Sequence, residues 1–393
     1  MKDATRIIEL GRDPEQQHGL VNPPLYRGST VLFPSLAALR EASAAPLRAE
    51  RYYGRHGTPT TAALEQAVAA LEGAERGIAV CSGLAAIAIV LSALAAPGDE
   101  VLVVDCVYGP TRAFCEQELA RRQIQVRYLP AAADAAAVRA ALTPRTRLIF
   151  LESPGSLSFE MQDVPAIVEL ARSTGIVTVM DNTWATPLGF AAAAAGVDVV
   201  IHAATKYLVG HADAMLGVIC TREALYERIK HTAVRFGQCP GAEEAQLGLR
   251  GLRTLAVRLE RHARTAEVLM RWLAAQPEVV AIRSPAWPDD PGHARWQRDF
   301  RGASGLFAAQ LVPLPEAALA ALVDGLAHFG LGFSWGGYES LVLPAMLAGQ
   351  RSLGEPPAGP LLRFHAGLEA EEDLLADLAA GFGRLRRARQ TRA

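Results

Sequence analysis

The chain has 393 residues, half of them hydrophobic, which is enough for a large core divided between two or three folding units. The 39 Lys and Arg residues nearly balance the 41 Asp and Glu residues, and the net charge of -2 gives no electrostatic reason to expect a nucleic-acid partner. The polar N-terminus lacks the apolar segment of a signal peptide, and the alanine run 191–195 is too short to cross a membrane, so we expect a soluble, cytoplasmic protein without a membrane partner.

Residues 1–57 are rich in Pro, Gly and Arg and show little regular periodicity, so we expect an extended N-terminal arm. Near its end lies Tyr53-Gly54-Arg55, whose phenol and guanidinium suit a phosphate group. Taken alone, the same segment is typical of a solvated turn.

From 58 to 252, short apolar runs alternate with helical patterns. Strands are expected near 77–81, 100–105, 147–151 and 176–180, with helices near 109–122 and 163–174. This alternation predicts an α/β domain whose mostly parallel sheet is covered on both faces. Ligands of such sheets bind beyond the carboxyl ends of the strands, and Gly83, Tyr108 and Asp181 each follow such an end.

The turn at Ser82 and Gly83 precedes an Ala-rich helix start. Free N–H groups at a helix N-terminus form an anion site, and glycine lets a phosphate approach closely. By itself this is weak evidence, because turns of this kind are common in α/β proteins.

Two further residues suggest a covalently bound carbonyl cofactor. Lys206 lies among Ala, Thr and Tyr in a small loop, and a lysine amine reacts with a carbonyl only when neutral, which requires a lowered pKa. Asp181 ends a buried strand, where a carboxylate can keep a pyridinium nitrogen protonated, as pyridoxal phosphate requires. Alone, Lys206 would be interpreted as a solvated lysine and Asp181 as a helix cap or turn residue.

From 253 to 393, a long helical pattern over 256–276 is followed by short strands and helices, which predicts a smaller α+β domain. The basic run 384–389 is interpreted as the frayed, solvated end of the last helix.

Five cysteines at irregular spacing argue against a disulfide framework and a zinc site, and we expect them to be reduced and structural. The nine histidines show no metal-binding spacing. No metal is therefore expected.

The ordered motifs resemble the pyridoxal-phosphate enzymes of cysteine and methionine metabolism, and within them most closely the bacterial cystathionine β-lyases. This resemblance implies an aspartate-aminotransferase-like fold (fold type I). The motifs that carry it are Tyr53-Gly54-Arg55, Tyr108, Glu152-Ser153-Pro154-Gly155-Ser156, Asp181-Asn182-Thr183-Trp184, the Lys206 segment, Gly251-Leu252-Arg253-Thr254-Leu255, Ser334-Trp335-Gly336-Gly337-Tyr338 and Arg363-Phe364-His365.

The resemblance also implies a role for each motif. Pyridoxal phosphate would be covalent on Lys206, with Asp181 at its ring nitrogen and Tyr108 stacked on the ring, so that Lys206 and Tyr108 are the catalytic residues. The phosphate would be held by Gly83, Leu84 and Thr205.

The substrate and the oligomer follow from the same resemblance. Arg363 would bind the substrate α-carboxylate, with Ser334 and Trp335 beside it. Tyr53 and Arg55 would reach the phosphate of a neighbouring subunit, and Tyr53 would also contact substrate, in a homo-oligomer expected to be a dimer of dimers.

The expected reaction is β-elimination of L-cystathionine to homocysteine, pyruvate and ammonia, in methionine biosynthesis. Three features favour it over γ-elimination or γ-replacement: the 152–156 turn lacks the asparagine of γ-acting relatives, Trp335 stands where they have leucine, and His365 replaces their usual serine. The resemblance also places Val234 where the best-known β-lyase has a tyrosine near the distal part of the substrate, which leaves cystine and other thioethers open.

The alternatives are a cystathionine γ-synthase or γ-lyase, a lyase of cystine or cysteine S-conjugates, and a cofactor-bound regulatory protein without turnover. The last is opposed by the presence of Lys206, Asp181 and Arg363 together, because a protein that no longer turns over is expected to lose one of them.

Overall fold

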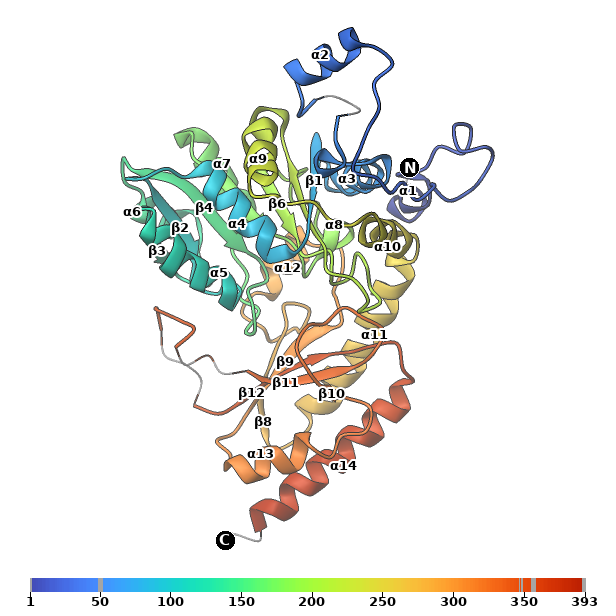
Figure 1. Ribbon diagram of the computed structural model, residues 1–393. Coiled ribbons are helices and arrows are strands. Elements are labelled where there is room, and N and C mark those ends of the chain that lie inside the picture. Colours follow the sequence, from blue (N-terminus) through green and yellow to red (C-terminus); the bar gives the residue numbers. More distant parts are fainter. Residues whose placement is uncertain (1, 49–51, 346, 348, 355–357, 391–393) are drawn as a thin grey trace.

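The computed structural model describes residues 2–48, 52–345, 347, 349–354 and 358–390. Seven strands form the larger of two sheets, in the order β1-β7-β6-β5-β4-β2-β3 (Figure 1). They are β1 (Arg76–Val80), β2 (Glu100–Val104), β3 (Gln125–Leu129), β4 (Thr146–Glu152), β5 (Val177–Asp181), β6 (Val199–His202) and β7 (Gly217–Thr221).

Strands β2 to β6 pair in parallel, and β7 runs antiparallel to β1 and β6, so the prediction of a mostly parallel sheet is confirmed. All five residues of β2 are buried, as expected for a strand covered on both faces. The flanking helices are α3 (Pro59–Glu72), α4 (Gly83–Leu94), α5 (Gly109–Phe114), continued by a π-helical turn (Cys115–Leu119), α6 (Ala135–Ala141), α7 (Val164–Thr174), α8 (Thr186–Gly189), α9 (Glu223–Arg235) and α10 (Ala242–Arg253).

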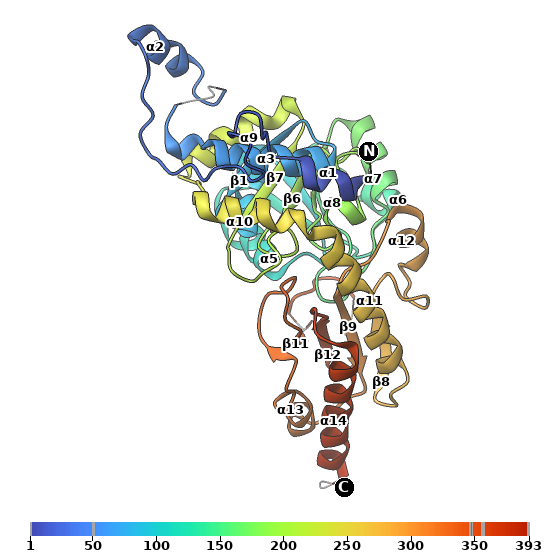
Figure 2. The same cartoon turned by 90° about the vertical axis from the view of Figure 1, so that its right-hand side faces the viewer.

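A second sheet, in the order β10-β11-β12-β9-β8, lies below the first in Figure 1. Its strands are β8 (Val279–Arg283), β9 (Leu306–Leu311), β10 (Gly330–Leu331), β11 (Leu341–Ala345) and β12 (Leu361–His365), and its helices are α11 (Leu255–Ala274), α12 (His293–Asp299), α13 (Glu316–Val323) and α14 (Glu371–Gln390). Figure 2 shows the long α11 running from the upper unit down beside the lower sheet.

Each sheet has its own hydrophobic cluster, and Phe307, Phe364 and Phe382 lie in the smaller one. The larger sheet ends before residue 253 and the smaller sheet begins after it. We therefore propose the domain boundary between 252 and 253, where the sequence predicts it.

The N-terminal 57 residues differ from the expected extended arm, because they contain α1 (Asp3–Glu9) and α2 (Leu36–Ala44). Ile7 is buried against the large domain, and Arg253 donates hydrogen bonds to the carbonyls of Ile7 (2.5 Å) and Leu10 (2.8 Å). Helix α2 has no buried residue and stands away from the body of the molecule (Figure 1). Helix α1 has seven residues and one buried residue, Ile7, so its sequence shows no repeated apolar spacing from which a helix could be predicted.

The expectation of a frayed basic end at 384–389 is wrong, because α14 extends through Gln390. Leu385 is fully buried, Arg384 donates to Ala321 O (3.0 Å), and Arg386 forms an ion pair with Glu278 (2.8 Å). The arginines of this turn thus anchor the helix to the rest of the domain.

All five cysteines are unpaired; three are buried (Cys106, Cys115 and Cys220) and two are exposed (Cys81 and Cys239). The expected structural role therefore suits the first three only. Within the described residues, no helix is both long and apolar enough to span a bilayer.

Candidate active site

Lys206 lies in the loop that follows β6, and its amine is the centre of the site. The Nζ atom donates a hydrogen bond to Ser334 Oγ, 2.6 Å away in the small domain. Burial, with the positive charge of Arg363 nearby, lowers the Lys206 pKa to about 8, against the opposing effect of Asp181. An appreciable fraction of the amine is therefore neutral near physiological pH, as a lysine that holds a carbonyl compound requires.

The turn that carries Ser334 packs directly against the loop of Lys206. Ser334 has a φ of +78°, a backbone conformation that is costly outside glycine and clusters at functional sites. A Cβ on Gly336 would lie 2.9 Å from Tyr207 N and 3.0 Å from Lys206 C, so glycine lets the turn pack directly on the lysine loop. Trp335 places its ring centroid 5.5 Å from Lys206 Nζ.

Asp181 ends β5 as predicted, and its carboxylate is buried. Its Oδ1 accepts from Thr183 N (3.0 Å) and Thr183 Oγ1 (2.5 Å). Burial raises the Asp181 pKa, although the Thr183 bonds and the nearby His202 and Lys206 act in the opposite direction. None of the described cationic groups forms an ion pair with this carboxylate, so a protonated ring nitrogen placed beside it would supply the missing positive charge.

Arg363 on β12 provides a partly buried cation. Its Nη2 donates to Ser334 O (3.0 Å), and within the described residues no carboxylate pairs with it. Burial lowers its pKa to about 10, so the guanidinium remains charged at neutral pH. A partly buried arginine without a carboxylate partner is suited to bind an incoming carboxylate through two parallel hydrogen bonds.

Tyr108 lies at the opening of the same site, with 46% of its surface exposed. Burial of the rest, together with Glu152 and Asp181, raises its pKa, and Arg363 acts in the opposite direction. The phenol is therefore protonated at neutral pH. Its stacking on the cofactor ring and its catalytic role stay predictions.

The predicted phosphate site is formed by the start of α4. The first amides of a helix, here Gly83 and Leu84, have no acceptor within the helix and can bind an anion. A Cβ on Gly83 would lie 2.5 Å from Ala203 Cβ, so glycine allows the helix to start against the lysine loop. The Thr205 hydroxyl bonds Leu216 N (2.9 Å) and Leu216 O (3.2 Å), and its phosphate contact stays a prediction.

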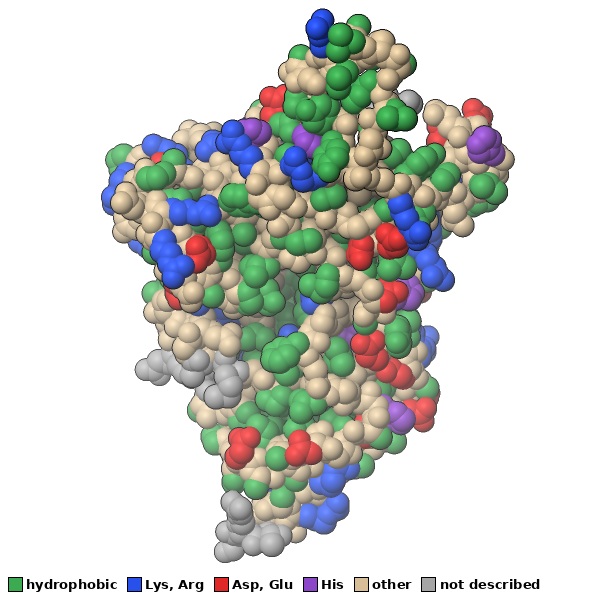
Figure 3. Space-filling view, viewed as in Figure 1, with side chains coloured by type: hydrophobic (Ala, Val, Ile, Leu, Met, Phe, Trp, Pro, Cys, Tyr) green, Lys and Arg blue, Asp and Glu red, His purple; other side chains and the backbone are tan. Residues whose placement is uncertain are grey.

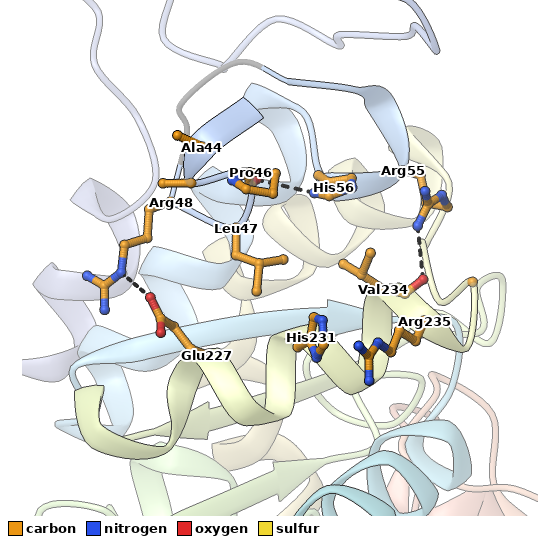
Figure 4. A pocket seen from close by; sticks show the side chains of 12 residues that line it. Ala44, Pro46, Leu47, Arg48, Arg55, His56, Glu227, His231, Val234 and Arg235 are labelled. Atoms are coloured by element: carbon orange, nitrogen blue, oxygen red, sulfur yellow. Dashed lines mark hydrogen bonds and ion pairs between the residues drawn. The ribbon is translucent and has the colours of Figure 1, made fainter. Parts of the chain in front are cut away.

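Tyr53 and Arg55 do not join this group within the chain. Arg55 Nη1 donates to Val234 O (2.9 Å) on α9, and its guanidinium lies 5.9 Å from the centre of the Tyr53 ring. Arg55 and Val234 line a separate cavity of about 840 Å³ between the arm and α9, together with His56 and His231 (Figure 4). The predicted roles of Tyr53 and Arg55 therefore depend on a second subunit.

Glu152 is a site residue that the sequence analysis did not single out. Its buried carboxylate accepts from Tyr108 N (2.7 Å) and Ser156 Oγ (2.5 Å), and it pairs with Asp181 across β4 and β5. Burial and the Asp181 charge raise the Glu152 pKa to about 8. Its position at the carboxyl end of a predicted strand was the available signal.

No pattern in the sequence indicated that two histidines, His262 and His365, lie together behind the site. His262 and His365 are buried with ring centroids 5.1 Å apart, and burial lowers their pKa values to about 4 and about 3, so both rings are neutral. The Tyr207 ring contacts the rings of His365 and Trp335, with centroids 5.9 Å and 5.4 Å away, and so helps to hold Trp335 beside Lys206.

The surface between the two lobes is hollowed, with hydrophobic side chains along its walls (Figure 3). A lysine with a lowered pKa, a buried carboxylate lacking a cation, a helix N-terminus and an unpaired arginine come together there. These groups fit the carbonyl, ring nitrogen and phosphate of pyridoxal phosphate and the carboxylate of an amino acid. Fold and site together thus define a fold type I pyridoxal-phosphate enzyme.

Comparison with known proteins agrees with this assignment and identifies the family within the class. Residues 4–383 match the family described as Cys/Met metabolism PLP-dependent enzymes. The chain belongs to this family, and its cofactor is pyridoxal phosphate.

Individual relatives cover almost the whole chain. It is 44% identical to a putative cystathionine β-lyase of Rhizobium johnstonii over 96% of this chain and 95% of that one. It is 40% identical to a cystathionine β-lyase of Escherichia coli over 97% and 98% of the two chains. Among solved structures, a cystathionine γ-synthase from Xanthomonas oryzae pv. oryzae in complex with cystathionine superposes with a TM-score of 0.91, at 31% identity and 99% coverage of both chains.

Proposed function

We propose that the protein is a carbon-sulfur lyase that cleaves L-cystathionine by β-elimination, giving homocysteine, pyruvate and ammonia. The observation that carries the proposal is the Lys206 amine, which is held on Ser334 with a lowered pKa beside the unpaired Arg363. The cystathionine β-lyases among its relatives support the choice of substrate.

Arg363 and Asp181 have different roles in this reaction. Arg363 binds the substrate α-carboxylate, and because its Nη2 also holds Ser334 O, the carboxylate is placed next to the turn that positions Lys206. Pyridoxal phosphate, when bound, supplies the sink for the electrons left at Cα. Asp181 keeps a positive charge on the ring nitrogen, which this sink requires.

Lys206 moves the protons. As a neutral amine it accepts the proton of the substrate Cα, and as an ammonium it returns that proton to the departing sulfur at Cβ. Ser334 Oγ fixes the amine between these two positions, and Trp335 covers one side of it. Acid-base help of this type is typically worth about 100- to 10,000-fold in rate.

The keto acid formed from L-cystathionine tests this function directly. We expect pyruvate and homocysteine in equal amounts, because cleavage at Cβ leaves a three-carbon fragment. Formation of 2-oxobutyrate with cysteine would instead establish γ-elimination. Assays with cystine and a cysteine S-conjugate in parallel show whether the substrate range is wider than cystathionine, as the predicted replacement of a distal tyrosine by Val234 suggests.

We further propose that the active site is completed by a second subunit in a homo-oligomer, expected to be a dimer of dimers. The support is that Tyr53 and Arg55 lie on the arm and have no contact with Lys206 within the described chain. Arg55 lines the cavity beside α9, where its guanidinium contacts Val234 O (Figure 4).

Mixing two inactive variants tests the shared site. We expect Tyr53→Phe/Arg55→Ala and Lys206→Ala each to lose activity, and their mixture to regain part of it after subunit exchange. The reason is that one site of the mixed dimer combines an intact Lys206 with an intact arm, and charge-assisted phosphate contacts are among the stronger hydrogen bonds. If exchange is demonstrated by mass and no activity returns, the arm serves its own subunit.

A further inference from the structure

The connection between β11 and β12 leaves the small domain and docks on the large one. In Figure 1 this connection extends from the lower sheet toward the edge of the upper domain that carries β3 and α5. Within it, the described segment 349–354 contains Arg351, Ser352 and Leu353, each of which binds residues more than 190 positions earlier in the chain.

Arg351 holds two loops of the large domain at once. Its Nη1 donates to Asp105 O (2.7 Å), and its Nη2 donates to Ser156 O (3.0 Å) and Ser158 Oγ (2.5 Å). Glu160 lies 3.6 Å from Nη2, and the Arg351 side chain is only 10% exposed. A guanidinium can bridge several acceptors in this way because its donors are held in a rigid plane, whereas an ammonium is a single point charge.

Asp105 binds the two residues that follow Arg351 in the connection. Its buried carboxylate accepts from Ser352 N (2.9 Å) and Leu353 N (3.0 Å) and pairs with Arg112, whose Nη1 also donates to Ser352 Oγ (2.8 Å). The connection is thus fastened by hydrogen bonds to charged groups, which are stronger than bonds between neutral groups.

The two loops that Arg351 joins carry parts of the active site. One contains Asp105 and Tyr108, and the other runs from Glu152 through Ser156. On the inner side, Glu152 already ties them together through Tyr108 N (2.7 Å) and Ser156 Oγ (2.5 Å). Arg351 ties them from the outer side, through Asp105 O and Ser156 O. Tyr108 is therefore carried by a loop that the small domain fixes in place.

We propose that Arg351 is a positioning residue that acts through Tyr108. The two loops are also joined within the large domain, by Ser156 N donating to Cys106 O (2.8 Å) and by Glu152, and Arg351 adds the bonds from the small domain that hold the Tyr108 loop in its final place. This inference rests on the proposed function for its effect on turnover, and the contacts that carry it do not involve substrate.

The first experiment measures amide hydrogen exchange in Arg351→Met, with and without cofactor. We expect faster exchange in segments 105–109 and 152–158, because both loops lose their outer hydrogen bonds. The matched control is Arg384→Met, which also removes arginine bonds to backbone carbonyls, those of Ala321 and Leu322, but within the small domain. Unchanged exchange in both loops of Arg351→Met overturns the proposal whatever the substrate proves to be.

The second experiment tests the link to Tyr108 by a double-mutant cycle in the lyase assay. We expect Arg351→Met to lower kcat/KM by about 10- to 100-fold, since a misplacement of about 1 Å can cost about 100-fold. In a Tyr108→Ala background the same change should cost less than about 3-fold, because the ring to be positioned is absent. Equal losses in both backgrounds overturn the proposal.

Arg351→Lys keeps the proposal testable if the methionine variant does not fold. The lysine retains a charge near Glu160 but cannot bridge both loops, so we expect a stable protein with intermediate kcat/KM and raised exchange in one or both loops. Wild-type levels of both overturn the inference. Absence of turnover in the wild type, with the exchange result intact, counts against the proposed function alone.

Discussion

Replacing Lys206 by alanine is expected to abolish both covalent attachment of pyridoxal phosphate and lyase turnover. The chain has three lysines, Lys2, Lys206 and Lys230. Lys230 is buried in an ion pair with Glu65 (3.3 Å), which raises its pKa, so its amine stays charged and cannot take over. Only Lys206 combines burial, a lowered pKa and a place beside Arg363.

Borohydride reduction followed by peptide mapping checks this without a turnover assay. We expect the cofactor mass on the peptide that contains Lys206, and no label in Lys206→Ala. Lys230→Arg is the matched control, because it keeps the ion pair with Glu65 while removing the other buried lysine; it should retain label and activity. A label on Lys2 or Lys230 in the wild type would contradict the assignment.

Asp181→Asn should retain the cofactor and lose roughly 100- to 1,000-fold in kcat, which corresponds to about 3 to 4 kcal/mol of transition-state stabilisation. The amide oxygen can still accept the Thr183 bonds, so the fold is expected to survive. What is lost is the negative charge that holds a proton on the ring nitrogen. Absorbance measures the retained cofactor, and steady-state kinetics measures kcat.

The control for this variant is Asp198, which precedes β6 and contacts the N-terminal end of β5. Asp198 accepts from Thr178 N (2.9 Å) and Thr178 Oγ1 (3.0 Å), the same pair of donor groups that Thr183 offers to Asp181, and it also pairs with Arg222 (3.1 Å). Asp198→Asn therefore removes a charge that binds the same donor groups away from the site, and kcat should stay within about 3-fold of wild type. Near wild-type kcat in Asp181→Asn would refute the role of that carboxylate.

The pattern of strands and helices was enough to predict the layout of half the site. Gly83, Tyr108 and Asp181 each follow a strand of the larger sheet, and parallel strands bring their carboxyl ends to one edge. Applying that rule requires only the positions of the strands, which local periodicity in the sequence predicts. Glu152 lies at the same edge and in a motif that carries the family resemblance, but neither observation was used to give it a role of its own.

The expected arm shows where local patterns fail. Residues 1–57 lack a long periodic segment, yet α1 docks because Ile7 and two backbone carbonyls meet Arg253 and the large domain. The basic end of α14 was misjudged for the same reason, since Arg384 and Arg386 bind residues about 60 or more positions away.

The amino-acid sequence predicted the α/β class from its local periodicity, and it predicted Lys206 and Asp181 from their residue types and their places near strands. The role of Arg363 followed from the family resemblance and not from a local pattern. The contact of Lys206 with Ser334, the joining of two loops by Arg351 and the separation of Arg55 from the cleft required the folded chain. Each of these contacts links residues more than 120 positions apart, and such pairs are selected by the packing of two domains and not by any local pattern.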